Sequence, residues 1–130
     1  MVLTPQLKPL IQNRLEICSL LGAGLGVLIR VVQYASNRSL WFDEVAIGLN
    51  LLDRSYLDLL NALDHNQAAP PLFLWAEKFF LETFGSSEYS LRLFPLIGGL
   101  LSLWLFYRFT QRWAETWVRP IAILLFSVQG

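Results

Sequence analysis

The stretch from residue 17 to residue 37 decides the fold of this chain, and its sequence is ICSLLGAGLGVLIRVVQYASN. It holds a single charged residue, Arg30, in 21 positions. As an α-helix it would extend about 31 Å, which matches the roughly 30 Å of a bilayer's hydrocarbon core. Lys8 and Arg14 precede it as in a signal peptide, but the apolar stretch continues past signal-peptide length. We therefore predict an uncleaved transmembrane helix over 17–37.

The composition of the whole chain also favours a membrane protein. Of its 130 residues, 55% are hydrophobic and 15% are charged, whereas about 25% are charged in soluble domains. A soluble chain of this length buries only about two-thirds of its surface and could not hide so much apolar area. The same composition excludes intrinsic disorder. Basic and acidic residues balance to a net charge of zero, so nothing predicts a nucleic-acid partner.

Further apolar segments predict a polytopic, all-α membrane protein. We expect a second transmembrane helix at 70–84, a third at 90–108 and the start of a fourth at 118–130. The second carries Glu77, Lys78 and Glu82, which must either face a protein interior or lie near the far interface. Because 13 residues are too few to span a bilayer, we expect the chain to be the N-terminal portion of a longer membrane protein.

The most polar part of the chain is the loop at 38–69, between the first two predicted spans. Its residues 41–52 predict a short apolar helix lying at the membrane surface. A second short helix is expected at about 56–63, with Ser55 as N-cap, Asp58 completing a capping box and Arg54 pairing with Asp58. Asp53 and Asp58 are therefore interpreted as structural. The aromatic residues near the boundaries are expected to be interface anchors: Trp41, Tyr56, Trp75, Trp113 and Trp117.

The adjacent carboxylates Asp43 and Glu44 support two interpretations. In the first, Asp43 is the N-cap of the following helix and Glu44 interacts with its positive end. In the second, Asp43 is a general base at the boundary of water and lipid, with a pKa tuned by partial burial. The two roles are compatible, because a cap would fix the rotamer that catalysis needs.

No metal or cofactor site is predicted. Cys18 is the only cysteine, lies in an apolar run and is expected to be a small buried hydrophobe. His65 is the only histidine and has no ligand cluster around it, so a solvated surface residue is the simpler interpretation. Its place at the start of the second predicted span nevertheless makes it a candidate for contact with a phosphate.

Three segments in order resemble motifs of the GT-C membrane glycosyltransferases, the superfamily of the dolichyl-phosphate-mannose–protein mannosyltransferases and the bacterial aminoarabinose transferases. Residues 40–45, LWFDEV, resemble the family's L-W-x-D-E-A motif. His65 with the later PPLF at 70–73 is similar to H-x-P-P-L-Y, here with extra residues between the histidine and the prolines. Residues 84–95, FGSSEYSLRLFP, resemble the F-G-x-S-E-x-x-x-R-L-P-S stretch. The resemblance covers roughly residues 39–112.

This resemblance implies transfer of a sugar from a polyprenyl-phosphate donor to an acceptor outside the cytoplasm, with inversion at the anomeric carbon. Asp43 is then the catalytic general base and Glu44 a supporting residue. Arg38, His65 and Arg108 are candidate contacts for the donor phosphate. The acceptor is not specified. Family members have many more helices and a further acidic residue after the third span, so the 130 residues alone are not expected to be active.

The orientation in the membrane is not settled by charge. With the four predicted spans, three basic residues lie on the N-terminal side and five on the other, which favours an external N-terminus. The resemblance implies the opposite: a cytoplasmic segment 1–16, an extracytoplasmic loop 38–69 and an integral protein of the plasma (inner) membrane. Two other functions stay open, a small membrane interaction protein using the Gly22/Gly26 spacing for helix contacts, and a transporter fragment.

Overall fold

A computed structural model describes residues 7–37, 39–64 and 67–129, and within these ranges the chain is helical without any strand. The elements in order are α1 (Leu7–Ala35), α2 (Phe42–Asp53), the short 3-10 helix η1 (Asp58–Leu60), α3 (Pro71–Phe84), α4 (Glu88–Trp113) and α5 (Val118–Val128). The prediction of an all-α chain is confirmed. The chain divides into two compact units, residues 1–32 with 98–130 and residues 33–97.

Two helices are long and apolar enough to cross a membrane, Pro9–Ala35 of α1 and Glu88–Trp113 of α4. They contain most of the first predicted span and all of the third. Helix α1 ends where Asn37 adopts a left-handed backbone conformation, with φ of 37°, which asparagine tolerates better than most residues. Pro95 lies inside α4, and helical backbone continues on both sides of it.

The second predicted span, 70–84, corresponds to the 14-residue helix α3, which is about 21 Å long. That length falls short of a hydrocarbon core, and α3 packs against α2 and η1. Its first residue, Pro71, suits the first turn of a helix, and Gly85 ends it with a φ of 90°. We therefore treat α3 as part of the segment between the two long helices.

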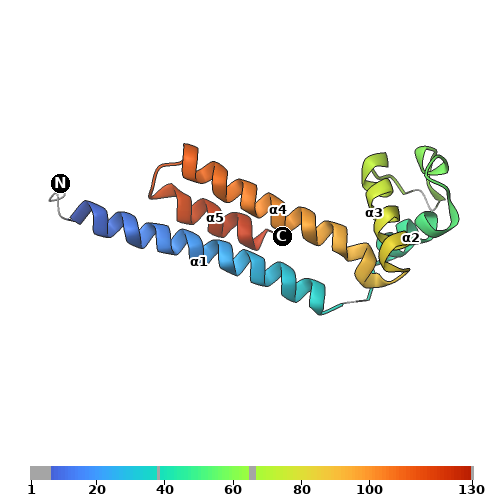
Figure 1. Cartoon of the computed structure of the whole chain (residues 1–130), viewed down its shortest axis with the longest axis horizontal. Helices are drawn as coiled ribbons and strands as arrows, with labels where there is room; N and C mark the ends of the chain where they lie inside the picture. The colour runs from blue at the N-terminus through green and yellow to red at the C-terminus, as the bar shows by residue number, and fades with distance from the viewer. Residues whose placement is uncertain (1–6, 38, 65–66, 130) are drawn as a thin grey trace. The chain divides into compact units, whose positions relative to one another are not determined.

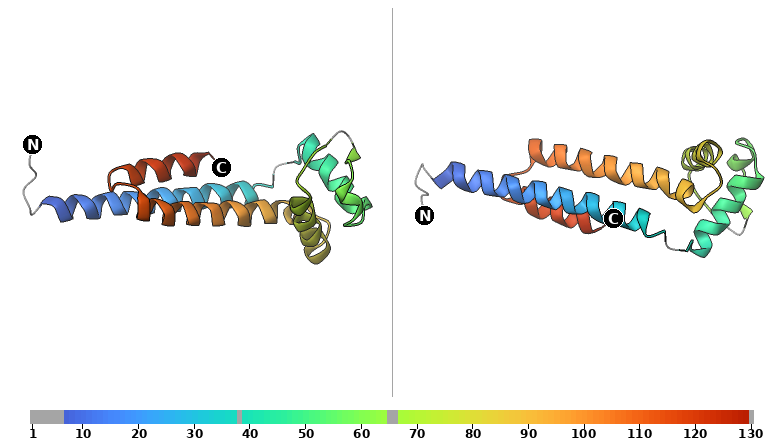
Figure 2. Two further views of the ribbon diagram at one scale, coloured as in Figure 1. Left: turned by 90° about the horizontal axis from the view of Figure 1, so that it is seen from above. Right: turned by 60° about the horizontal axis from the view of Figure 1, so that its bottom comes forward.

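In the first unit, α4 and α5 lie alongside α1, as Figure 1 and both views of Figure 2 show. Helix α5 runs parallel to α1: Gly22 faces Ile123, and Gly26 faces Ser127, whose hydroxyl donates a 2.9 Å hydrogen bond to the Gly22 carbonyl. A Cβ on Gly26 would stand 2.6 Å from the Ser127 Oγ and 2.9 Å from a Leu103 methyl. The Gly22/Gly26 spacing is therefore used for contacts within the chain.

Arg30, the charge inside the first predicted span, has partners in the same unit. Its Nη1 donates to the carbonyls of Gly26 (3.1 Å) and Ser127 (3.3 Å), and its guanidinium lies 6.0 Å from the Phe126 ring centre. Gly99 makes room for it, because a Cβ there would lie 3.2 Å from the Arg30 Nε. These contacts offset the cost of a charge within an apolar helix.

The second unit has a small apolar core of four buried leucines, Leu51, Leu59, Leu74 and Leu81. Asn50 fastens the loop to α2: its Nδ2 donates to the Ala46 carbonyl, and its Oδ1 accepts a 3.0 Å hydrogen bond from the Asp64 amide. Burial of leucines stabilises this unit by about 1.5–3 kcal/mol for each side chain.

Several local predictions need correction. The helix expected at 56–63 is reduced to η1, which ends where the backbone of Asn61 becomes extended, and its N-cap is Leu57, not Ser55. Arg54 donates to the Ala62 carbonyl (2.8 Å) and pairs with Asp64 (2.9 Å) in place of Asp58. The reciprocal Ser55–Asp58 hydrogen bonds are confirmed, and the serine hydroxyl lowers the Asp58 pKa. Cys18 is exposed on α1, not buried.

Candidate functional site

Asp43 is the second residue of α2. This helix belongs to the polar segment that joins the two long helices. Its carboxylate is exposed, and its Oδ1 accepts a hydrogen bond of 3.4 Å from the Gln67 side-chain amide. The N-cap of α2 is Trp41, so the interpretation of Asp43 as the N-cap is wrong. Two carboxylates in the first turn still match the positive end of the helix dipole.

Glu44 holds the first turn of α2 in place. Its Oε2 accepts a 3.2 Å hydrogen bond from the Trp41 backbone N–H and a 3.2 Å ion-paired hydrogen bond from the Arg92 Nη2. Arg92 stands one turn inside α4 and keeps only 18% of its side chain exposed. Nearby, Gly48 lets α4 approach, since a Cβ there would lie 3.3 Å from a Leu91 methyl. Glu44 therefore fixes the backbone next to Asp43.

The exposed surface of α2 is apolar around these carboxylates. Trp41 and Phe42 are 78% and 75% exposed, and Val45, Leu49 and Leu52 are exposed on later turns. A helix with one apolar face bared and the other packed on protein is typical of the membrane interface. A mostly apolar cavity of about 200 Å³ lies beside this helix, with Ser86, Ser87 and Glu88 as its polar wall. The remaining lining residues are Leu40, Val45, Gly48, Leu49, Leu52, Leu81 and Leu91.

The other predicted site residues are not brought together with Asp43 by the described contacts. Arg38 and His65 lie outside the described residues. Arg108 belongs to the first unit, where its guanidinium lies 5.8 Å from the Trp104 ring centre. No group of three potential metal ligands forms among the described residues.

The predicted interface aromatics divide into two groups. Trp41, Trp113 and Trp117 are exposed, as expected of anchors. Tyr56 and Trp75 contact each other instead, with the Trp75 indole N–H donating a 2.7 Å hydrogen bond to the Tyr56 carbonyl. This contact joins Tyr56, which lies just before η1, to Trp75 of α3.

Glu77 is a carboxyl group buried in the second unit, with 2% of the residue exposed. Its Oε2 has no hydrogen-bond partner among the described residues. The burial raises the pKa of Glu77 to about 8, because an ionised carboxylate loses its hydration there. The adjacent Lys78 is satisfied, donating 2.8 Å to the Leu51 carbonyl and pairing with Glu82 at 3.3 Å. The sequence left two places open for these charges, a protein interior or the far membrane interface. Glu77 and Lys78 lie in the protein interior.

We expect this carboxyl to make stability fall as pH rises. The pKa of Glu77 in the folded state is above its unfolded-state value of 4.5. Its contribution to the free energy of unfolding is therefore complete below pH 4.5 and is lost as the pH rises through 8. The slope is about 1.4 kcal/mol for each pH unit within that window. Denaturant unfolding in micelles from pH 5 to 8 should show the fall in wild type and a flat profile in Glu77→Gln.

The matched control for that experiment is Asp53→Asn, which removes an exposed carboxylate at the end of α2. It should keep the wild-type slope. An unchanged slope in Glu77→Gln would show that the buried carboxyl is not the source of the pH dependence.

Sequence reasoning missed two residues at the site, Arg92 and Gln67. Arg92 was visible only as one letter of the third motif, and Gln67 only as part of a polar loop. Their partners lie 48 and 24 positions away along the chain, and a sequence without its fold carries no signal of such a pairing.

Comparison with known proteins adds no assignment to this geometry: no protein-family model, no curated protein and no solved structure matches the chain.

Proposed function

We propose that this chain is the N-terminal part of a multi-pass membrane glycosyltransferase that uses a polyprenyl-phosphate sugar as donor. The observation that carries the proposal is an exposed carboxylate, Asp43, in the first turn of a helix with a bared apolar face, between two helices able to cross a membrane. A lipid-linked sugar needs this arrangement, because its tail stays in the bilayer while its phosphate and sugar reach water. The order of the three motifs described above supports the same class of enzyme.

In the proposed reaction Asp43 accepts the proton of an acceptor hydroxyl. The hydroxyl oxygen attacks the anomeric carbon as the bond from that carbon to the phosphate oxygen breaks, with inversion. The lipid phosphate leaves as the anion, and the proton remains on the Asp43 carboxyl until water takes it. The Glu44–Arg92 ion pair keeps the backbone at the start of α2 in place during this transfer. The apolar cavity beside α2 is of a size to hold the first part of the isoprenoid chain.

We further propose that the N-terminus is cytoplasmic in the plasma (inner) membrane and that residues 36–87 are extracytoplasmic. With α1 and α4 as the spans, the basic residues at the N-terminal end are Lys8, Arg14, Arg108, Arg112 and Arg119, against Glu16 and Glu115. Residues 36–87 hold three basic and seven acidic residues. The basic end belongs inside under the positive-inside rule, so the two-span count agrees with the orientation that the resemblance implies.

Thiol labelling of the 130-residue chain tests this orientation, since Cys18 is its only cysteine. On a Cys18→Ser background, Ser86→Cys should react with a membrane-impermeant maleimide added to intact cells. Glu115→Cys should react only after the membrane is permeabilised. Labelling in the reverse pattern would overturn the orientation.

The enzymatic proposal is tested with the full-length protein that contains this segment. Membranes carrying it should transfer radiolabelled sugar from polyprenyl-phosphate donors to an extracytoplasmic protein, lipid or glycan acceptor, whereas membranes without it should not. If no sugar moves from any of a panel of such donors, including the mannosyl and aminoarabinosyl lipids, the assignment fails.

A further inference from the structure

A second cavity lies in the first unit, at the end where α1 begins and α4 gives way to α5. It measures about 290 Å³, and polar and apolar atoms contribute about equally to its lining. The α1 wall supplies Gln12, Leu15, Glu16 and Ser19, and the other walls supply Gln111, Thr116, Arg119 and Ile123. Its volume is at the lower end of the range of small-molecule pockets, roughly 300 Å³, which suits a compact polar group.

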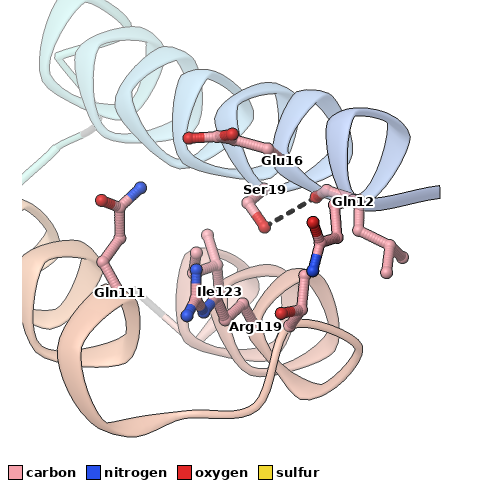
Figure 3. Close-up of a pocket in the computed structure, with 8 residues that line it drawn as sticks. Gln12, Glu16, Ser19, Gln111, Arg119 and Ile123 are labelled. Atoms are coloured by element: carbon pink, nitrogen blue, oxygen red, sulfur yellow. Dashed lines mark hydrogen bonds between the residues drawn. The ribbon is translucent and has the colours of Figure 1, made fainter. Parts of the chain in front are cut away.

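The two charged residues of this cavity stand on facing helices. Figure 3 shows Glu16 on α1 and Arg119 on α5 on opposite sides of the opening, with Gln111 beside them. They form no ion pair with each other within the part of the chain that the structure describes. Arg119 is half-buried and uses its Nε to donate a 3.0 Å hydrogen bond to the Ala114 carbonyl, which orients the guanidinium.

The position of this cavity along the helices matches the headgroup region of a bilayer. Trp113 at the end of α4 and Trp117 on the connection that follows are 76% and 61% exposed, and exposed indoles of this kind mark the membrane interface. On α1 the lining begins at Gln12, near the start of the apolar span at Pro9, and extends inward to Ser19. Charged side chains at this depth can meet the charged groups of lipid headgroups.

We propose that this cavity binds the headgroup of an ethanolamine phospholipid, with its phosphate on Arg119 and its ammonium on Glu16. A zwitterionic group places an anion opposite the guanidinium and a cation opposite the carboxylate, so both charges are paired at once. An ethanolamine ammonium has N–H donors for the Glu16 carboxylate, whereas choline's methyl groups remove them. The Gln12 side-chain amide and the Thr116 hydroxyl supply further donors to phosphate oxygens, and Gln111, whose Nε2 donates to the Tyr107 hydroxyl, has a second amide N–H for the same purpose.

Lipid binding by the purified 130-residue chain in micelles tests this proposal. Short-chain phosphatidylethanolamine, phosphatidylcholine and phosphatidylglycerol would each be titrated, and retained lipid counted by native mass spectrometry. Phosphatidylethanolamine should bind about tenfold more tightly than the other two, which corresponds to one charge-assisted hydrogen bond. Equal binding of all three lipids, or a preference for phosphatidylglycerol, would overturn the proposal.

Variants separate the two halves of the site. Glu16→Gln should remove the preference for ethanolamine over choline, and Arg119→Gln should weaken both about tenfold, while Arg119→Lys retains most of the binding. Arg112→Gln is the matched control, because this exposed cation lies at the same end of the unit but outside the cavity. A loss in Arg112→Gln equal to that in Arg119→Gln would show general attraction of phosphate and overturn the site.

Circular dichroism checks that each variant keeps its helix content. Should Arg119→Gln unfold, the ethanolamine-to-choline ratio in Glu16→Gln decides alone, because that side chain is exposed and its loss leaves the backbone contacts in place. The lipid-binding proposal rests on the insertion of this chain in a membrane, and it does not depend on sugar transfer. Its failure leaves the role of Asp43 untouched, and an inactive enzyme leaves lipid binding untouched.

Discussion

Asp43→Asn in the full-length protein should lower sugar transfer by about 10²–10⁴-fold, the usual contribution of a positioned general base. The asparagine amide keeps the size of the carboxylate and can still contact Gln67, but it cannot accept the acceptor's proton. Transfer of label from the polyprenyl-phosphate donor measures the loss. Normal turnover by the variant would remove Asp43 from the catalytic role.

The structure makes this test cleaner than sequence alone suggested. Because Trp41 is the N-cap of α2, Asp43→Asn removes no cap, and only a helix-dipole interaction of about 0.3–1 kcal/mol is at stake. Insertion and folding should therefore be unchanged. Asp53→Asn at the other end of the same helix is the matched control and should retain activity. If the chain were an interaction protein, neither variant would have a functional effect.

Gly26→Val should destabilise the first unit by about 1–3 kcal/mol, the range for overpacking. Even its Cβ would stand 2.6 Å from the Ser127 Oγ and 2.9 Å from the Leu103 methyl, so α5 must move away from α1. That movement also breaks the hydrogen bond from Ser127 to the Gly22 carbonyl and the one from Arg30 to the Ser127 carbonyl. Denaturant unfolding in micelles measures the lost stability, and protease cleavage near 114–117 should become faster.

Gly24→Val is the matched control, since nothing lies within 4 Å of a Cβ at that position. Both variants place the same β-branched residue in the same helix, so intrinsic propensity cancels and the difference reports packing alone. Equal stability of the two variants would mean that α5 does not dock on this face of α1. In that case the Gly22/Gly26 surface would again be open to a partner helix, as the interaction hypothesis requires.

The helical elements could largely be predicted because their signals are local. The long apolar runs correspond to α1 and α4, and the hydrogen bonds between Ser55 and Asp58 depend on spacing within four residues. The sequence predicted a helix at 70–84 but not its environment. Apolar composition does not distinguish a short helix packed on protein from one that crosses lipid. Helix α3 is the former in its contacts, with Leu74 and Leu81 in the core of the second unit.

The sequence by itself predicted an all-helical chain with long apolar segments, two of which correspond to helices able to cross a membrane, and an acidic segment after the first of them. It also singled out Asp43 and Glu44 as neighbours at the start of a surface helix. Only the tertiary structure decided what those residues contact: Arg92 as the partner of Glu44, Glu77 as a buried carboxyl, and α5 as the occupant of the glycine face. Hydropathy and capping act over one or two helical turns, whereas these pairings join residues up to 105 positions apart and exist only once the helices pack.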